Sequence, residues 1–303
     1  MSLRAQLERR AAVFAAIRRF FADRGVLEVT TELIHPYAPS DPFGRCLRAI
    51  DEQGAVQGWL LPSPELAMKP LLAAGAGDIF QICKAFRAGE SGPRHRPEFT
   101  LVEWYRNHWD YVALASETVE LINVLLPGLA ETRYRYVELW GELLQMEPFA
   151  LDVAALAHRF AEAGKPPLPG GLSAREMRDL AFAELIEPRL PAGVVTVFDF
   201  PAEQTAMAGR RDDDPRWALR FEVFVNGVEI ANGYAEQNDS KLQRRAWRED
   251  NQERRVLGLP ERVPDEMLLA AMDAPGLPHC AGVALGFDRL LMVRDGRNSL
   301  DDG

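Results

Sequence analysis

The residues best suited to do chemistry lie in a hairpin at positions 221–230, which carries two glutamates on either side of an Asn-Gly pair. Asn-Gly between apolar flanks predicts a two-residue type I′ turn. In that register Glu222 faces Ala231, and Glu229 shares its face as a diagonal neighbour roughly 7–8 Å away. Two carboxylates so placed favour Mg²⁺ that also binds phosphate oxygens, and a solvated strand face is the alternative.

A second segment, residues 86–99, concentrates cationic side chains between two predicted strands. These are Arg87, Arg94, His95 and Arg96, and Phe99 follows on the second strand. Arginine forks suit phosphate oxygens and an aromatic face suits a purine ring, so the segment is a candidate nucleotide site. A solvated basic hairpin tip is the alternative interpretation.

A third segment, residues 282–293, begins with small residues at positions 282, 284 and 286. Small residues allow close approach of the backbone, and Asp288-Arg289 is expected to begin a helix. The segment predicts either a tight joint between a strand and a helix or an arginine that reaches a bound nucleotide.

The composition limits the classes of function. The formal net charge is -10 with pI ≈ 5.2, which disfavours a surface devoted to nucleic-acid phosphates and favours a small-molecule substrate or a basic protein partner. No run of about 18 apolar residues and no signal peptide is present. Cys46, Cys83 and Cys280 are odd in number and form no CxxC pair, which disfavours disulfides and zinc and fits a reducing cytoplasm.

The elements that position these residues follow from hydrophobic periodicity and turn signals. Helices are expected at 3–24, 112–126, 151–163, 173–187, 239–257 and 264–272, and strands at 26–31, 78–87, 98–106, 194–200 and 217–230. Helices mixed with antiparallel hairpins indicate an α+β fold. Neither a Walker A loop nor a GxGxxG fingerprint occurs, which excludes the two commonest nucleotide-binding folds.

Taken in chain order, residues 86–99, 221–230 and 282–293 resemble motif 2, the metal-binding hairpin and motif 3 of class II aminoacyl-tRNA synthetases. Similarity is greatest to the catalytic domain of lysyl-tRNA synthetases, and it spans residues 5 to 294. The supporting segments are 63–66, 86–87, 97–100, 103–105 and 229–236. The resemblance implies an antiparallel sheet flanked by helices, in a single catalytic domain over residues 1–303 without an anticodon-binding domain.

Without an anticodon-binding domain, the chain resembles the truncated lysyl-tRNA synthetase paralogues of the EpmA, PoxA or GenX family. Those ligases attach (R)-β-lysine to a lysine side chain of elongation factor P. Trp104 and the stretch 282–286 resemble this branch, because Ala284 stands where the synthetases carry glycine. The resemblance implies a homodimer that uses ATP and Mg²⁺, activates lysine or β-lysine as its adenylate, and acts on elongation factor P without anticodon or membrane recognition.

The resemblance also assigns roles to individual residues. Arg87 and Arg289 are the expected catalytic residues, with Arg87 on the α-phosphate. The expected ATP site comprises Arg87, Ala88, Gly89, Glu90, His95, Arg96, Phe99, Glu229, Ile230, Gly286 and Arg289. The expected amino-acid site comprises Ser63, Pro64, Glu65, Glu103, Tyr105, Asn232, Glu236 and Ala284. Glu222 and Glu229 are the expected metal ligands, as the hairpin register suggested independently.

Three positions depart from the family pattern. Gly89 replaces a glutamate and is followed by Glu90, and Arg96 replaces an asparagine. In motif 1, where the family carries a proline at the dimer interface, this chain has Glu32 after Thr30-Thr31. Two other functions stay open: a ligase of the same chemistry with another acceptor such as tRNA, and a catalytically silent regulatory module. The retained phosphate arginines and paired glutamates favour a catalyst.

Overall fold

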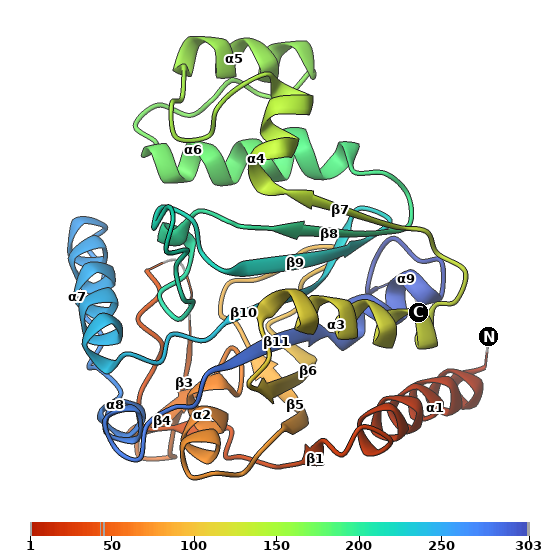
Figure 1. The fold of residues 1–303 in the computed structure, drawn as a ribbon, viewed down its shortest axis with the longest axis vertical. Coiled ribbons are helices and arrows are strands. Elements are labelled where there is room, and N and C mark those ends of the chain that lie inside the picture. The colour runs from red at the N-terminus through yellow and green to blue at the C-terminus, as the bar shows by residue number, and fades with distance from the viewer. Residues whose placement is uncertain (1, 43, 45, 302–303) are drawn as a thin grey trace.

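The computed structural model describes residues 2–42, 44 and 46–301. Its centre is an eight-stranded sheet in the order β1-β5-β6-β11-β10-β9-β8-β7 (Figure 1). The strands are β1 Leu27–Glu28, β5 Ile79–Phe86, β6 Glu98–Asn107, β7 Glu131–Arg135, β8 Val194–Phe198, β9 Arg220–Val225, β10 Val228–Ala235 and β11 Cys280–Gly286. The β1–β5 and β7–β8 pairs are parallel and the other pairs are antiparallel, so the predicted α+β class is confirmed.

One face of the sheet carries the largest hydrophobic core. Helices α1 Leu3–Ala22, α3 Tyr111–Leu125 and α9 Phe287–Arg294 supply buried residues to it. Trp104, Val223 and Val283 meet them from the strands. Because side chains alternate along a strand, the neighbours of these core residues point to the opposite face.

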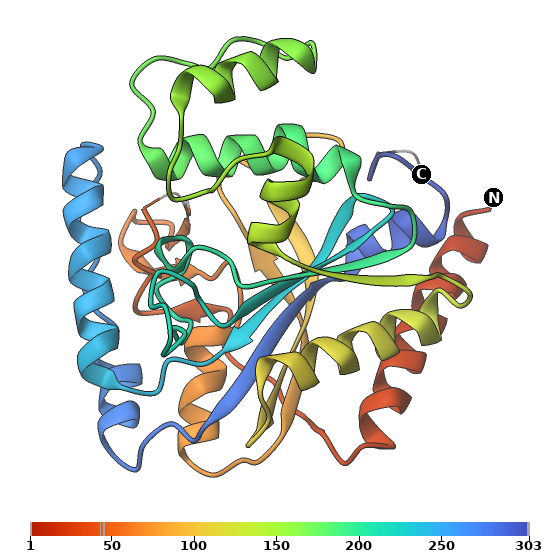
Figure 2. The same ribbon diagram turned by 45° about the horizontal axis from the view of Figure 1, so that its top comes forward.

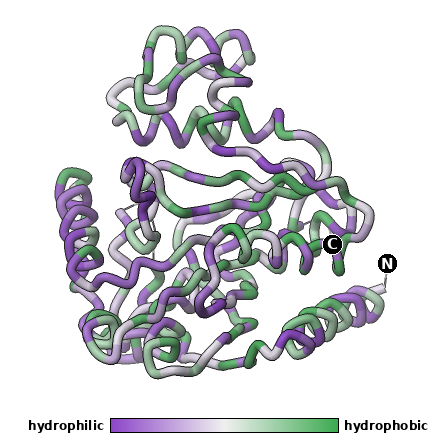
Figure 3. Tube along the Cα trace, in the orientation of Figure 1, coloured by the Kyte–Doolittle hydropathy of each residue, from purple (hydrophilic) through white to green (hydrophobic). Residues whose placement is uncertain are grey.

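Three further helices lie beyond one end of the sheet: α2 Glu65–Ala73, α7 Ser240–Val256 and α8 Glu266–Asp273. They share a smaller core with the strand residues Ile79, Tyr105 and Cys280. A three-stranded sheet adjoins them, with β2 Ile34–His35, β3 Leu47–Ile50 and β4 Val56–Leu60 in the order β2-β4-β3. Hydrophilic residues predominate along α7 (Figure 3).

The β7 edge is covered by another group of helices, which comes forward in Figure 2. It contains α4 Tyr136–Leu139, α5 Val153–Glu162 and α6 Ala174–Ala181, and α4 and α6 each continue into a π-helix, at Trp140–Leu144 and Phe182–Ile186. Their apolar faces enclose a third core with β8. Among the described residues, no helix combines the length and apolar character needed to cross a bilayer.

Local sequence signals explain most boundaries. Ser2, Asp110 and Asp239 accept hydrogen bonds from the first backbone N–H groups of α1, α3 and α7, as N-cap side chains do. Gly25, with φ of 69°, ends α1 as expected. The strand expected at 26–31 was wrong in extent, because β1 has one neighbour at the sheet edge and pairs over two residues.

Candidate active site

Two rows of register partners cross the sheet on the face opposite the large core. The first row is Glu103, Ala284, Asn232 and Glu222, and the second is Tyr105, Gly282, Tyr234 and Arg220. Both rows run over β6, β11, β10 and β9. Partners directly opposite each other share a face, so residues from distant parts of the sequence meet on one surface.

A β-bulge in β10 makes the register of the hairpin differ from the expected one. The expectation that Glu222 faces Ala231 was wrong, because Glu222 pairs with Asn232 and the register shifts at Ile230. An extra residue on one strand changes which later side chains share a face. Glu229 therefore precedes the bulge and Asn232 follows it, and both line the same cavity.

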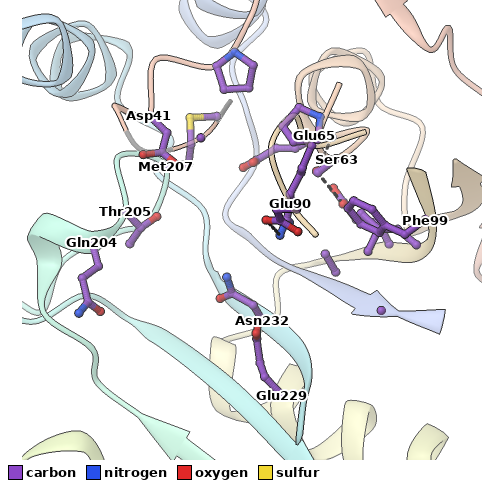
Figure 4. Close-up of a pocket in the computed structure, with 18 of the residues that line it drawn as sticks. Asp41, Ser63, Glu65, Glu90, Phe99, Gln204, Thr205, Met207, Glu229 and Asn232 are labelled. Carbon is purple, nitrogen blue, oxygen red and sulfur yellow. Dashed lines mark hydrogen bonds and ion pairs between the residues drawn. The ribbon is translucent and has the colours of Figure 1, made fainter. Parts of the chain in front are cut away.

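The cavity on this face has a volume of about 720 Å³. Every expected site residue lines it except Pro64, which lies buried at the N-terminus of α2 between Ser63 and Glu65. Figure 4 shows the side chains that meet there from separate elements: Ser63, Glu65, Glu90, Phe99, Glu229 and Asn232. The nucleotide and amino-acid sites expected from the sequence are thus parts of one continuous cavity.

At one end of the cavity, Arg289 joins the three segments that the sequence singled out. Its Nη1 donates to Glu229 Oε2 at 2.9 Å, its Nε donates to the carbonyl of Arg94 at 3.2 Å, and its Nη2 lies 2.6 Å from His95 Nε2. Burial and the Arg289 charge lower the pKa of His95, which favours the neutral ring that accepts this hydrogen bond.

Asp288 fixes the helix that carries this arginine. One carboxylate oxygen accepts from the Thr100 amide at 2.6 Å and the other pairs with Arg10 at 2.7 Å. The start of α9 is thereby attached to β6 directly beside Phe99. Helix α9 begins at Phe287, one residue before Asp288, so the helix start expected at this point in the sequence is confirmed.

Arg87 lies over the ring of Phe99, with 5.1 Å between the guanidinium carbon and the ring centroid. Its Nη1 is 3.7 Å from Glu90 Oε1. Gly89 has φ of 79°, a conformation that favours glycine, so the chain turns there and the next residue supplies the carboxylate. Where the family pattern has a glutamate, this chain therefore has a turn at Gly89, and Glu90 brings a carboxylate near Arg87.

Arg96 lines the cavity, but its guanidinium has protein partners. Its Nη2 donates to the carbonyl of Leu300 at 2.6 Å and to Asp301 Oδ1 at 2.7 Å. The Leu300 amide donates to the carbonyl of Pro93 at 2.7 Å. Arg96 thus connects the loop to the C-terminal segment, and its expected contact with ATP stays a prediction.

The other end of the cavity is acidic. Glu103 is 2% exposed and accepts hydrogen bonds from Ser63 Oγ at 2.8 Å and from the Tyr105 hydroxyl at 2.7 Å. Burial and the nearby Glu65 raise the pKa of Glu103 to about 7. Glu236 is also buried, and Glu65 lines the same end of the cavity, so three carboxylates meet there.

Sequence reasoning missed the cation at the centre of these carboxylates. Lys69 is 1% exposed, and its Nζ lies 2.6 Å from Glu65 Oε1 and 2.5 Å from Glu236 Oε2. Tyr234, also missed, donates its hydroxyl to Glu65 Oε1 at 2.5 Å. The available signal was the Glu65–Lys69 spacing of four residues, which places both on one side of a helix.

The two predicted metal ligands are each paired with an arginine in this structure. Arg220 Nη2 lies 2.5 Å from Glu222 Oε1, and Arg289 holds Glu229. Burial, together with the carboxylates of Glu229 and Glu187, raises the pKa of Glu222 to about 8 despite the Arg220 charge. Within the described ranges, no group of three or more His, Cys, Asp or Glu side chains forms a ready-made metal cage. Two carboxylates that line one face of the cavity nevertheless suit Mg²⁺ that completes its ligands with phosphate oxygens.

Comparison with known proteins agrees with this geometry. The family model for class II tRNA synthetases (D, K and N) matches residues 1–302, so the chain belongs to the class II tRNA synthetase family. It is 39% identical over 310 residues to the elongation factor P–(R)-β-lysine ligase of Sodalis glossinidius, a match that covers 98% of this chain and 93% of that protein. A ligase of the same name from Pectobacterium carotovorum is 40% identical over 308 residues, with the same coverage. Within the class, the chain is a member of the family of these ligases.

Proposed function

We propose that this protein is an ATP-dependent ligase that activates (R)-β-lysine or lysine as its adenylate and transfers it to a lysine side chain of elongation factor P. The observation that carries the proposal is one cavity with an arginine-rich end and a buried carboxylate-rich end. The first end suits the phosphates of ATP, and the second suits a substrate with two ammonium groups. The ligases named in the comparisons support the acceptor.

In the first step the amino-acid carboxylate attacks the α-phosphorus of ATP, and the bond to pyrophosphate breaks. Charge that develops on the α-phosphate oxygens is stabilised by Arg87, while His95 and Arg289 contact the outer phosphates. Adenine stacks against Phe99. When bound between Glu222 and Glu229, Mg²⁺ would neutralise phosphate oxygens.

In the second step a lysine amine of the acceptor, in its neutral form, attacks the carbonyl carbon of the adenylate. The carbon–oxygen bond to AMP breaks, an amide bond forms, and the attacking nitrogen loses a proton. The protein's part is to hold the two reactants in line and to neutralise charge, so no covalent bond to the enzyme is required.

The active form that we propose is a cytoplasmic homodimer. Apolar side chains are exposed along β1 and the small sheet at Leu27, Ile34, Ile50 and Val56, with between 47% and 62% of each residue exposed. A second copy of the chain would cover this surface. The absence of disulfides among Cys46, Cys83 and Cys280 agrees with a reducing compartment.

Amino-acid-dependent exchange of pyrophosphate into ATP tests the first step. Exchange is expected with (R)-β-lysine and, more weakly, with lysine, and its absence with both would refute the proposal. Mass spectrometry of elongation factor P after incubation with enzyme, ATP and amino acid tests the second step. Exchange without a mass increase on that protein would redirect the acceptor to another molecule such as tRNA.

A further inference from the structure

We propose that Lys69 is a positioning and specificity-determining residue of the amino-acid pocket, which holds Glu65 and Glu236 and sets the pocket's charge to match a substrate with two ammonium groups. This inference rests on the proposed function and deepens it. Lys69 itself does not line the cavity, so it acts through the carboxylates that do.

The geometry around Lys69 is that of a built internal counter-ion. Its Nζ bridges Glu65 on the same helix, at 2.6 Å, and Glu236 directly after strand β10, at 2.5 Å. The Nζ also lies 5.8 Å from the centroid of the Tyr234 ring, and that tyrosine's hydroxyl bonds to Glu65. The two carboxylates are therefore held at a fixed separation by groups that the substrate does not have to displace.

Charge counting connects this geometry to the substrate. Glu65, Glu103 and Glu236 carry three negative charges when ionised, and Lys69 carries one positive charge, which leaves two negative charges. A diamino acid supplies two ammonium groups at this end of the cavity. A monoamino acid of the same shape would leave one buried carboxylate without a counter-charge, which is costly.

Burial and charge support the same assignment. The Glu236 and Glu65 carboxylates raise the pKa of Lys69 despite its complete burial, so the side chain stays an ammonium. Burial and, after it, the Glu65 charge raise the pKa of Glu103 to about 7, so a cation placed beside this carboxyl favours its ionised form. Lys69 lowers the pKa of both Glu103 and Glu236, so its removal would raise the pKa values of these two carboxyls further.

The test compares Lys69→Met with the wild-type protein. Methionine keeps similar length and apolar bulk but removes the charge. The KM for (R)-β-lysine or lysine in the exchange reaction is expected to rise about tenfold or more, because a buried ion pair is broken, while the KM for ATP stays within about twofold. The acid limb of kcat/KM against pH is expected to move to higher pH.

A matched control separates these effects from lost stability. Arg106→Met removes another buried cation between two carboxylates, since Arg106 is 6% exposed and pairs with Asp78 at 2.9 Å and Glu117 at 3.1 Å. It lies outside the cavity. This variant is expected to melt at a lower temperature without any shift of the acid limb. If Lys69→Met behaves in the same way, the proposal is overturned.

Electrostatic rescue gives a second decision. The double variant Lys69→Met with Glu65→Gln again has two net negative charges, so its acid limb is expected to move back toward the wild-type position. A limb that stays at the Lys69→Met position would contradict the charge-counting argument, even if the KM remains high because Glu65 is lost.

Calorimetry keeps the inference testable when catalysis is absent. Lysine is expected to bind the wild-type protein at pH 7 with proton release, measured in buffers of different ionisation enthalpy. Norleucine, which lacks the second ammonium group, is not expected to bind in this way. Equal affinity for both would overturn the role of Lys69. Wild-type protein that binds lysine in this way but gives no exchange would refute the proposed ligase function and leave the role of Lys69 intact.

Discussion

Gly282 and Tyr105 lie directly opposite each other on β11 and β6, and the tyrosine ring occupies the space that a side chain at position 282 would need. The Glu236 carboxylate borders the same space. The absence of a side chain at Gly282 therefore allows two residues of the acidic pocket to approach each other. The glycine is required here for its size, since its φ lies outside the left-handed region.

Gly282→Ala should impair amino-acid binding selectively. The added methyl would displace Tyr105 or Glu236, an overpacking strain of about 1–3 kcal/mol, so the KM for the amino acid should rise about tenfold with little change for ATP. Gly141→Ala is the control, because a Cβ there meets no atom within 4 Å and should be tolerated. Unchanged amino-acid kinetics in Gly282→Ala would contradict the pocket assignment.

Ala284→Gly should change which lysine isomer is preferred. Ala284 lies between Glu103 and Asn232 in the first row, so its methyl forms part of the pocket floor. Its removal should raise kcat/KM for α-lysine relative to (R)-β-lysine by about tenfold, within the 1–3 kcal/mol expected for one methylene. Ala281→Gly, on the same strand but in the hydrophobic core, should lower stability and leave this ratio unchanged. The same kcat/KM ratio for the two lysine isomers in the wild-type protein and both variants would contradict the prediction.

Glu229→Gln should lose activity without unfolding. The glutamine keeps the shape but removes a charge that Mg²⁺ requires, so the exchange rate should fall by about 100-fold, as for loss of one preorganised electrostatic group. The side chain is 37% exposed, which predicts little change in melting temperature. Glu98→Gln, an exposed partner of Lys84 outside the cavity, serves as the control and should keep full activity.

The pH dependence of amino-acid use should report the acidic pocket. Glu103 must be ionised to accept an ammonium group, and its pKa is raised to about 7, so kcat/KM for the amino acid should fall as the pH drops below about 7. Glu103→Gln should abolish this limb or the activity itself. A profile that stays flat from pH 6 to 8 in the wild-type protein would contradict the prediction.

The same group predicts an effect on stability. Because the pKa of Glu103 is raised from 4.5 to about 7 on folding, the folded protein binds more protons than the unfolded chain between these values. Its contribution to stability is thus present below about pH 4.5 and is lost as the pH rises through about 7. Glu103→Gln should therefore raise the melting temperature more at pH 8 than at pH 5.

The sequence was sufficient for the parts of the fold that strong local signals specify. The Asn-Gly turn, the two strands around residues 88–97 and the helix at Asp288 were all predicted and found. Three spaced segments were also enough to anticipate which side chains gather at the arginine-rich end of the cavity. These features depend on turn chemistry and on side chains close together in the sequence.

Other features depend on tertiary context. The helix that carries Lys69 has Pro70 in its interior, a residue that usually signals a helix end, and it was not predicted. The partner Glu236 is 167 positions away in the sequence, so no local pattern relates the two. The short strands β2 and β7 were not predicted either: β2 spans two residues, and β7 alternates only between exposed and half-buried side chains.

The bulge at Ile230 changes which residues of β10 share a face of the sheet. Glu229 is an odd position and Asn232, Tyr234 and Glu236 are even ones, yet all of them line the cavity. In a regular strand, odd and even positions face opposite ways, so either Glu229 or the even-numbered group would point into the hydrophobic core. A single additional residue thus lets both halves of one strand line the same cavity, with Glu229 at its arginine-rich end and Glu236 at its acidic end. A single-residue insertion or deletion between Glu229 and Asn232 would turn one of these two groups away from the cavity, although every residue of the motif would still be present in the sequence.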